Sequence, residues 1–124
     1  MARILRPLLI AIALASGADP ALAGDAAKGK AVFQGECAMC HSVAAHAPGI
    51  GPTLFDVVGR KAGSLAGYSY SNAMKGAGFV WSQAKLDTYL RAPQKVVPGD
   101  KMPYTGLTNP AKRADLIAYL ATFK

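Results

Sequence analysis

The chain has 124 residues, which is enough for one ordinary domain but not for two. It holds 14 Lys and Arg against 7 Asp and Glu, a formal net charge of +7, while 52% of its residues are apolar and only 17% are charged. This composition is too apolar and too weakly charged for an intrinsically disordered chain. Two cysteines are also too few for a disulfide-rich scaffold, so we expect one small globular domain.

The first 23 residues have the pattern of a secretory signal peptide. Two arginines precede an unbroken apolar run at residues 8–15, and the segment ends in an A-x-A cleavage pattern at residues 21–23. The run is far shorter than the ~20 residues that span a bilayer. A buried core helix or an uncleaved anchor is the alternative. Cleavage after Ala23 removes two basic residues and one acidic residue, which leaves a domain of residues 24–124 with a net charge of +6.

Helix signals lie at both ends of this domain. Asp25 is placed to cap a helix that includes Phe33. Near the other end, Asn109 is an N-cap candidate, Pro110 suits the first helical position, and apolar residues then recur at helical spacing as far as Phe123. The sequence therefore predicts helices at the two termini of the domain.

The middle of the domain is rich in Gly and Pro. A helix is predicted from Ser82 to about Ala92, where the following proline ends it, and a short helix is predicted at residues 71–75. Residues 47–67 and 92–110 are predicted to be loops, and strand signals are weak. The predicted fold class is therefore all-α. Loops of this length need a surface to pack on, which a large apolar cofactor would supply.

Both cysteines fall in the motif Cys37-Ala38-Met39-Cys40-His41. The pattern C-x-x-C-H is the attachment signature of c-type haem. Two thiols add across the two vinyl groups of the porphyrin, and the adjacent imidazole then ligates the iron. The predicted export fits this interpretation, because a covalent bond retains haem in a compartment that has no haem pool.

Three alternatives exist for the same residues. A thioredoxin-like C-x-x-C would need a βαβ pattern, which the sequence does not show. A disulfide between the two cysteines would close a very short loop and add little stability. A zinc site made of Cys37, Cys40, His41 and His46 would place all its ligands within about ten residues, closer than zinc motifs usually do. Each alternative fits the pattern less well than haem does.

A haem iron held by one His has a second axial position, which a Met thioether closes in many electron-transfer proteins. Three Met residues follow the predicted leader. Met39 lies inside the attachment motif and cannot reach the opposite haem face. Met74 is interpreted as a core residue. Met102 lies in a loop between two prolines, whose fixed φ angles stiffen it, and it is therefore the predicted sixth ligand.

The order of motifs in residues 24–124 resembles that of the class I soluble cytochromes c of the mitochondrial and related bacterial type. The matching residues are Gly24-Asp25, Lys28-Gly29-Lys30, Phe33, Cys37, Cys40, His41, Gly51-Pro52, Leu54, Gly59-Arg60-Lys61, Gly63, Tyr68, Tyr70, Trp81, Leu86, Tyr89-Leu90, Pro93, Pro98-Gly99, Lys101-Met102 and Leu116-Ile117-Ala118-Tyr119-Leu120. The resemblance implies a small single-haem fold with long loops around the haem. In that fold the C-terminal helix crosses the N-terminal helix at Gly29.

The same resemblance implies roles for individual residues. The carbonyl of Pro52 would orient His41, and Met102 would be the distal ligand. Tyr89 would lie near the Met sulfur and tune the reduction potential. Three residues would donate hydrogen bonds toward the buried haem propionates: Arg60, Tyr70 and Trp81.

The sequence departs from the family pattern at three places. Met74 stands where the family commonly has Asn, and Asp100 replaces a Thr that usually faces a propionate. Four positions at the haem edge where the mitochondrial type tends to carry Lys hold other residues: Glu36, Gln94, Thr108 and Asn109. Lys95 and Lys101 remain there, so the positive charge at this edge is thinned.

The resemblance implies a monomeric one-electron carrier, not an enzyme, with one covalent haem c, and the predicted signal peptide places it in the periplasm of a Gram-negative-type bacterium. The expected donor is a quinol–cytochrome c reductase, and the expected acceptor is a terminal oxidase or a photosynthetic reaction centre; a periplasmic dehydrogenase is an equal candidate. Nucleic acid, the generic partner of a basic chain, does not fit export. The alternative is a haem-based gas sensor or peroxidase-like protein with an open distal site, in which Met102 is not a ligand.

Overall fold

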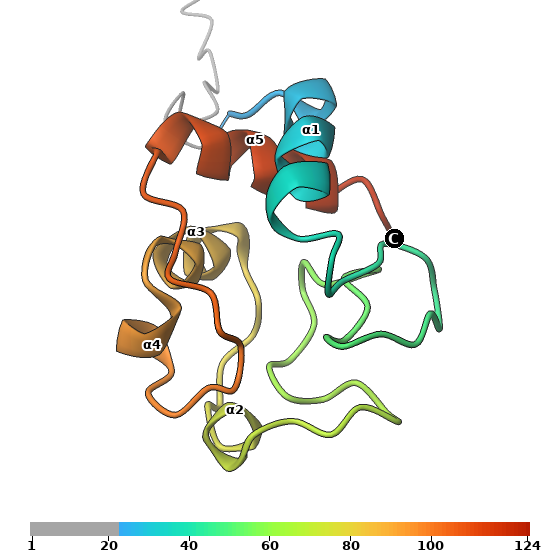
Figure 1. Cartoon of the computed structure of the whole chain (residues 1–124), viewed down its shortest axis with the longest axis vertical. Coiled ribbons are helices and arrows are strands. Elements are labelled where there is room, and N and C mark those ends of the chain that lie inside the picture. Colours follow the sequence, from blue (N-terminus) through green and yellow to red (C-terminus); the bar gives the residue numbers. More distant parts are fainter. Residues whose placement is uncertain (1–22) are drawn as a thin grey trace, which may run out of the picture.

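The computed structural model describes residues 23–124, which form five helices joined by long loops (Figure 1). The helices are α1 (Ala26–Glu36), α2 (Asn72–Lys75), α3 (Gln83–Arg91), α4 (Pro93–Val96) and α5 (Pro110–Leu120). Within this range the β pairing is limited to an isolated bridge between Lys61 and Val80. The all-α prediction is therefore confirmed. The prediction of a leader falls on residues 1–23, and all but the last of these lie outside the described residues.

Four of the helices begin where a capping side chain was predicted or is available in the sequence. In each, the side-chain oxygen of the N-cap residue accepts a hydrogen bond from the backbone N–H three residues later, which satisfies one free donor of the first turn. These N-cap residues are Asp25, Ser71, Ser82 and Asn109. Local sequence thus determines where these helices start. Among residues 23–124, none of the helices has the length and hydropathy to cross a membrane.

The prediction of an uninterrupted loop at residues 92–110 is wrong at its beginning. Ala92 ends α3, and Pro93 then opens the four-residue helix α4. A proline at the first helical position loses no hydrogen bond and already has a helical φ. The residue that stops one helix therefore starts the next, and α4 turns the chain toward the loop that contains Met102.

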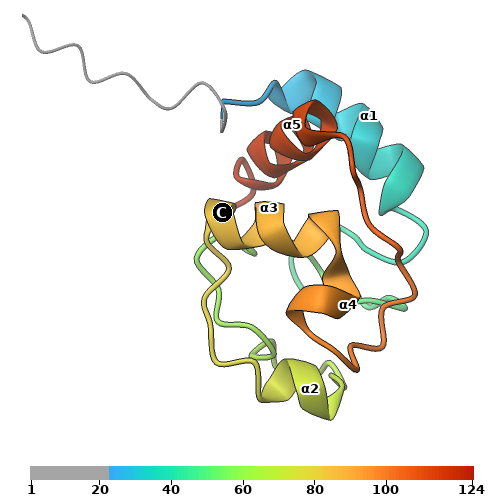
Figure 2. The ribbon, with the colours of Figure 1, turned by 90° about the vertical axis from the view of Figure 1, so that its left-hand side faces the viewer.

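Helices α1 and α5 cross at one end of the molecule (Figures 1 and 2). Gly29 lies at the crossing, where a Cβ would overlap the backbone oxygen of Asp115 and would lie 2.7 Å from Cβ of Tyr119. The backbone N–H of Asp25 donates to the Asp115 carboxylate at 2.8 Å. The ring of Phe33 packs on Tyr119 with 5.6 Å between centroids. The crossing at Gly29 that the resemblance implied is therefore present.

Helix α3 packs against α5 and is joined to it by a partly buried ion pair. The Arg113 guanidinium donates to Asp87 at 2.9 Å and to the carbonyls of Leu107 and Thr108, both at 2.9 Å. These bonds fix α5 on α3 together with the end of the loop that precedes α5. The buried apolar residues of the core are Phe33, Val57, Ala62, Met74, Trp81, Leu86, Tyr89, Val97, Leu107, Leu116, Ile117 and Leu120.

Candidate functional site

The two cysteines lie in a tight turn that follows α1. Cys37 ends the helix, and its carbonyl accepts hydrogen bonds from the N–H groups of Cys40 at 3.1 Å and His41 at 2.9 Å. Both cysteines are half-buried free thiols. Burial, with a smaller contribution from the charge of Glu36, raises the pKa of Cys37 to about 11. Its thiol therefore stays neutral near pH 7, which suits an apolar partner better than a metal cation that binds thiolate.

The imidazole of His41 is fixed by the loop at residues 49–53. Its Nδ1–H donates to the carbonyl oxygen of Pro52 at 2.7 Å, so the free lone pair is on Nε2. Gly51 packs against the face of the ring, where a Cβ would overlap Cε1 and lie 2.7 Å from Nδ1. Burial is the main cause that lowers the pKa of His41. The neutral imidazole thus presents one coordinating nitrogen in a fixed orientation.

Met102 lies half-buried in the loop between α4 and α5. Its backbone N–H points to the Asp100 carboxylate at 3.4 Å. The amide of Gln94, on α4, donates to the carbonyl of Asp100 at 2.7 Å and accepts from the N–H of Gly99 at 3.3 Å. Helix α4, which the sequence did not predict, therefore helps to hold the loop that contains Met102.

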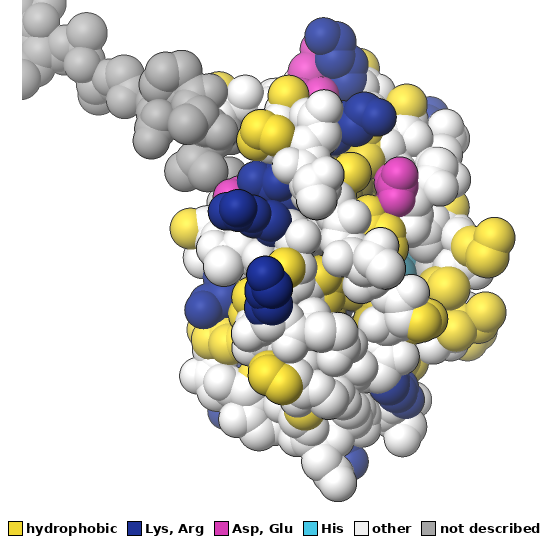
Figure 3. Space-filling model, turned by 60° about the vertical axis from the view of Figure 1, so that its left-hand side comes forward, with side chains coloured by type: hydrophobic (Ala, Val, Ile, Leu, Met, Phe, Trp, Pro, Cys, Tyr) yellow, Lys and Arg dark blue, Asp and Glu magenta, His cyan; other side chains and the backbone are white. Residues whose placement is uncertain are grey.

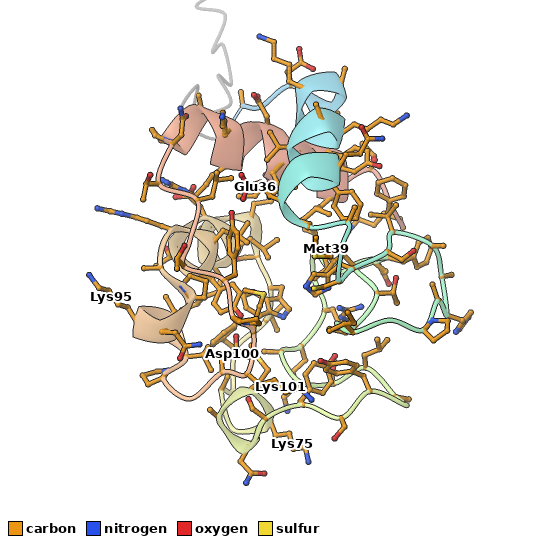
Figure 4. The ribbon with its side chains drawn as sticks, viewed as in Figure 1. Glu36, Met39, Lys75, Lys95, Asp100 and Lys101 are labelled. Atoms are coloured by element: carbon orange, nitrogen blue, oxygen red, sulfur yellow. The ribbon has the colours of Figure 1, made fainter. Side chains whose placement is uncertain are left out.

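Lys101 ties the same loop to a second segment. Its ammonium donates to the carbonyl of Ser69 and lies 4.8 Å from the centroid of the Tyr68 ring. Figure 4 labels Asp100 and Lys101 in this loop and shows Lys95 projecting outward from α4. Lys101 thus helps to hold the loop while its side chain stays exposed, so its positive charge remains on the surface.

Two of the predicted aromatic residues, Trp81 and Tyr89, are buried and pack on each other, whereas Tyr70 packs on Tyr68. Trp81 packs edge-on against Phe79 and Tyr89, with ring centroids 4.8 and 4.7 Å apart. The Tyr89 hydroxyl donates to the Asp100 carboxylate. Burial, followed by this hydrogen bond, raises the pKa of Tyr89 well above its ordinary value. Asp100, whose carboxylate the resemblance placed near a propionate, therefore has Tyr89 as a neutral hydrogen-bond partner.

Arg60 and Tyr70 belong to the loops between Pro52 and α2. The Arg60 guanidinium donates to the carbonyls of Thr53 at 2.9 Å and Phe55 at 3.1 Å. The Tyr70 hydroxyl accepts from the backbone N–H of Leu65 at 3.2 Å. These contacts stabilise the loops that follow Pro52. The donation of hydrogen bonds to haem propionates stays a prediction for Arg60, Tyr70 and Trp81.

The charge of Asp100, two residues before Met102, acts on His41 and opposes the lowering of its pKa. Met74 is buried with 7% of its surface exposed, as expected for a core residue. Among residues 23–124, no three His, Cys, Asp or Glu side chains come together as a metal site. The zinc alternative therefore has no ligand cluster in the described part of the chain.

One side-chain contact at this site was missed by sequence reasoning. The Tyr104 hydroxyl donates to Glu36 Oε2 at 2.9 Å, across 68 residues of sequence. An aromatic residue two positions after Met102 was the available signal, but its partner lies on α1 and no local pattern connects them.

The donors present match the chemistry of a c-type haem. Two neighbouring thiols, a neutral imidazole nitrogen and a half-buried thioether occur together with partly buried apolar side chains of the loops, such as Leu54 and Val43. Thioether bonds need the thiols, and His/Met axial ligation needs one nitrogen and one sulfur. The residues therefore fit a covalently bound haem with two protein ligands.

Comparisons with known proteins agree with this donor set. Residues 26–124 match the family model described as cytochrome c. The chain is 50% identical to cytochrome c2 of Rhodomicrobium vannielii over 115 residues, which cover 92% of this chain and 91% of the relative. It is 47% identical to cytochrome c of Arabidopsis thaliana over 104 residues, which cover 83% of this chain and 93% of the relative. The solved structure of cytochrome cH from Methylobacterium extorquens superposes with a TM-score of 0.75 at 47% identity, covering 80% of this chain and 99% of that one.

The chain belongs to the cytochrome c family. It has the class I fold and is an electron-transfer protein rather than an enzyme. Its cofactor is covalently bound haem c, and its redox partners dock transiently.

Proposed function

We propose that cleavage after Ala23 releases residues 24–124 as a monomeric periplasmic carrier of single electrons. Haem c is attached through Cys37 and Cys40, and its iron is ligated by His41 and Met102. The observation that carries this proposal is the hydrogen bond from His41 Nδ1–H to the carbonyl of Pro52 at 2.7 Å. It leaves Nε2 as the single coordinating nitrogen, and hydrogen bonding of the other ring nitrogen raises the basicity of a ligating histidine.

When bound, haem c supplies a one-electron Fe(III)/Fe(II) couple. The chain's own residues give this couple a rigid and dry environment. Gly51 and Pro52 fix His41, while Asp100 and Gln94 fix the loop that contains Met102. Ligands held in place on both sides keep the structural change between oxidation states small. Three further residues are proposed to donate toward the propionates: Arg60, Tyr70 and Trp81.

The proposed partners are larger redox proteins. A quinol–cytochrome c reductase is the proposed donor, and a terminal oxidase, a reaction centre or a periplasmic dehydrogenase is the proposed second partner. Figure 3 shows Lys and Arg side chains scattered among apolar and other polar groups over the face in view. Dispersed positive charge favours small transient interfaces with a modest dependence on salt.

The optical spectrum of the protein matured in a bacterial periplasm tests the ligand set. We expect a low-spin spectrum with the weak Fe(III)–thioether band, no shift on addition of carbon monoxide to the reduced protein, and loss of the band in Met102→Ala. Met74→Leu is the matched control, because this buried Met packs in the core, and it should keep the band.

A high-spin wild-type spectrum that shifts with carbon monoxide would overturn this ligand set. It would support the open-site alternative, a gas sensor or a peroxidase-like protein. Loss of the band in Met74→Leu but not in Met102→Ala would instead assign the sulfur ligand to Met74. N-terminal sequencing of the same sample tests the cleavage site, and a mature chain that does not begin at Gly24 would contradict it.

A further inference from the structure

Two segments far apart in sequence flank the proposed haem site. One is the end of α1 with the Cys37–His41 turn, and the other is the loop at residues 97–109, which contains Met102. Within the described residues, the hydrogen bond that joins these two segments runs from the Tyr104 hydroxyl to Glu36 Oε2, at 2.9 Å. We call this contact the Glu36–Tyr104 bridge. Figure 4 shows Glu36 at the end of α1 nearest the Met39 turn.

The bridge is placed where it controls the distance between the two segments. Glu36 directly precedes Cys37, which is proposed to be bonded to the haem, and Tyr104 follows Met102 by two residues. A tether between these positions restrains the Met102 loop relative to the point of haem attachment. The restraint is direct, because one partner ends a helix and the other has its ring packed against the core.

The chemistry of the pair favours a persistent hydrogen bond. A phenol that donates to a carboxylate forms a charge-assisted bond, which is stronger than a bond between two neutral groups. The bond length of 2.9 Å is that of a well-formed hydrogen bond.

The other anchors of the loop lie on its remaining sides. Gln94 holds Asp100 from α4, and Lys101 reaches the carbonyl of Ser69. Closer to α5, the N–H of Leu107 donates to the carbonyl of Leu90 at 2.8 Å, and Arg113 holds the last carbonyls of the loop. None of these bonds joins the loop to α1. If the bridge is broken, the loop keeps these attachments but loses its hydrogen bond to the segment that precedes Cys37.

We infer that Tyr104 is a positioning residue for Met102, whose bond to Glu36 holds the Met102 loop closed against the haem attachment segment and slows loss of Met102 from the iron. This inference rests on the proposed ligation by Met102. A partly exposed hydrogen bond of this kind contributes about 0.5–1.5 kcal/mol, which corresponds to a change of about 2- to 10-fold in the population of the open loop.

The test uses the oxidised haem protein and measures how fast excess imidazole displaces the thioether, followed by loss of the Fe(III)–thioether band. Tyr104→Phe removes the hydroxyl and keeps the ring, and it should speed displacement by about 2- to 10-fold. Glu36→Ala should give a similar increase, and Glu36→Gln, which keeps an acceptor oxygen, a smaller one. The displacement rate of the double variant Tyr104→Phe/Glu36→Ala should be close to that of either single variant, because both changes remove the same hydrogen bond.

Tyr119→Phe is the matched control. It also removes a tyrosine hydroxyl, but its ring packs between Phe33 and Phe123 near the α1–α5 crossing. Its displacement rate should equal that of the wild type. A second measurement, amide hydrogen exchange at Met102 and Leu107, should show faster exchange in Tyr104→Phe than in the wild type and in Tyr119→Phe.

The possible outcomes separate this inference from the proposed function. If the wild type lacks the thioether band, the ligation by Met102 is wrong and the positioning role falls with it. If the band is present but imidazole displaces the thioether in Tyr104→Phe and in Glu36→Ala at the wild-type rate, the inference is wrong and the proposed ligand set stands. Faster amide exchange without faster displacement would also overturn it, because the bridge would then order the loop without holding Met102.

Discussion

At the scale of single residues, the proximal side of the site depends on the absence of a side chain at position 51. A Cβ on Gly51 would overlap the His41 ring carbon Cε1, while the neighbouring Pro52 carbonyl fixes Nδ1 at 2.7 Å. The backbone of these two residues thus determines both the position and the tautomer of the imidazole. A side chain at Gly51 would force the ring away from that orientation.

Gly51→Ala should therefore destabilise the haem protein by about 1–3 kcal/mol, the usual cost of adding a group to a packed site. It should also lower the low-spin fraction, because the imidazole is displaced. Denaturant unfolding and the visible spectrum measure the two effects. Gly76→Ala is the control, since its Cβ would meet an atom at 3.4 Å, an ordinary contact. Equal stability of the two variants would contradict the predicted overlap.

Tyr89 gives a prediction for the dependence of stability on pH. Burial and the bond to Asp100 raise its pKa in the folded state above the ordinary value of 10.0. A group whose folded pKa is raised stabilises the fold fully below its unfolded pKa, and this contribution is lost as pH rises through the folded value. Above pH 10 the unfolded chain ionises Tyr89 while the folded chain does not.

The stability advantage of the wild type over Tyr89→Phe should therefore be constant below about pH 9 and shrink by up to about 1.4 kcal/mol per pH unit above pH 10. The free energy of unfolding of both proteins is measured from the fluorescence of the single Trp, followed through guanidinium unfolding at pH 8, 10 and 11. Taking the difference cancels the titration of other groups. An advantage that stays constant to pH 11 would argue against a buried, hydrogen-bonded Tyr89.

At the scale of elements, two glycines on α1 have opposite roles. Gly29 lies at the crossing with α5, where a Cβ would overlap the Asp115 backbone oxygen, whereas a Cβ on Gly35 would meet nothing within 4 Å. Both lie in the same helix, so the helix propensity of alanine favours both substitutions equally. The difference between them isolates the packing of α1 on α5.

Gly29→Ala should lower the free energy of unfolding by about 3 kcal/mol, near the upper end for overpacking, because backbone rather than a flexible side chain must move. Gly35→Ala should instead raise it by about 0.5–1 kcal/mol. Thermal or denaturant unfolding of the two haem proteins checks both values. If Gly29→Ala were as stable as the wild type, the close approach of the helices would be wrong.

The predictions made for the helices succeeded where the signal was local. The caps predicted at Asp25 and Asn109 occur, and the helix predicted to start at Ser82 begins there with Ser82 as its cap, because an N-cap depends on contacts within one turn. Helix α4 was not predicted, since four residues are too short to show helical periodicity. Its Pro93 was interpreted as the end of α3, and it is also the first residue of α4.

At the scale of the whole molecule, the fold has a thin core and long loops. The buried apolar side chains lie mainly on α3 and α5 and in the loops, with one each on α1 and α2. Leu54, Tyr70 and Met102 are only partly buried. A group that binds the folded chain and not the unfolded one stabilises the fold. Haem c is therefore expected to be part of the core of this protein.

The double variant Cys37→Ala/Cys40→Ala, which cannot hold haem covalently, should lose much of its helical signal in far-ultraviolet circular dichroism at 25 °C. Met39→Ala is the control within the same motif, because Met39 is 91% exposed, and it should retain wild-type signal and stability. If the double variant kept the full helical signal and the wild-type unfolding midpoint, the loops would be stable without the covalent cofactor.

The sequence by itself determined the helices with capping signals, the haem attachment motif and the choice of Met102 over Met39 and Met74 as candidate ligand. Each of these depends on residues within a few positions of one another, so the physical cause is visible in the local pattern. The resemblance to the cytochrome c family added the crossing at Gly29 and the partnership of Pro52 with His41, and both are present.

Only the tertiary structure decided which distant side chains meet. Tyr104 reaches Glu36 across 68 residues, and the partly buried Asp100 accepts a hydrogen bond from the hydroxyl of Tyr89. Both contacts depend on the path of the loop that α4 directs, and no periodicity or motif encodes that path. Contacts of this kind depend on chain geometry, because a loop is positioned by everything it packs against.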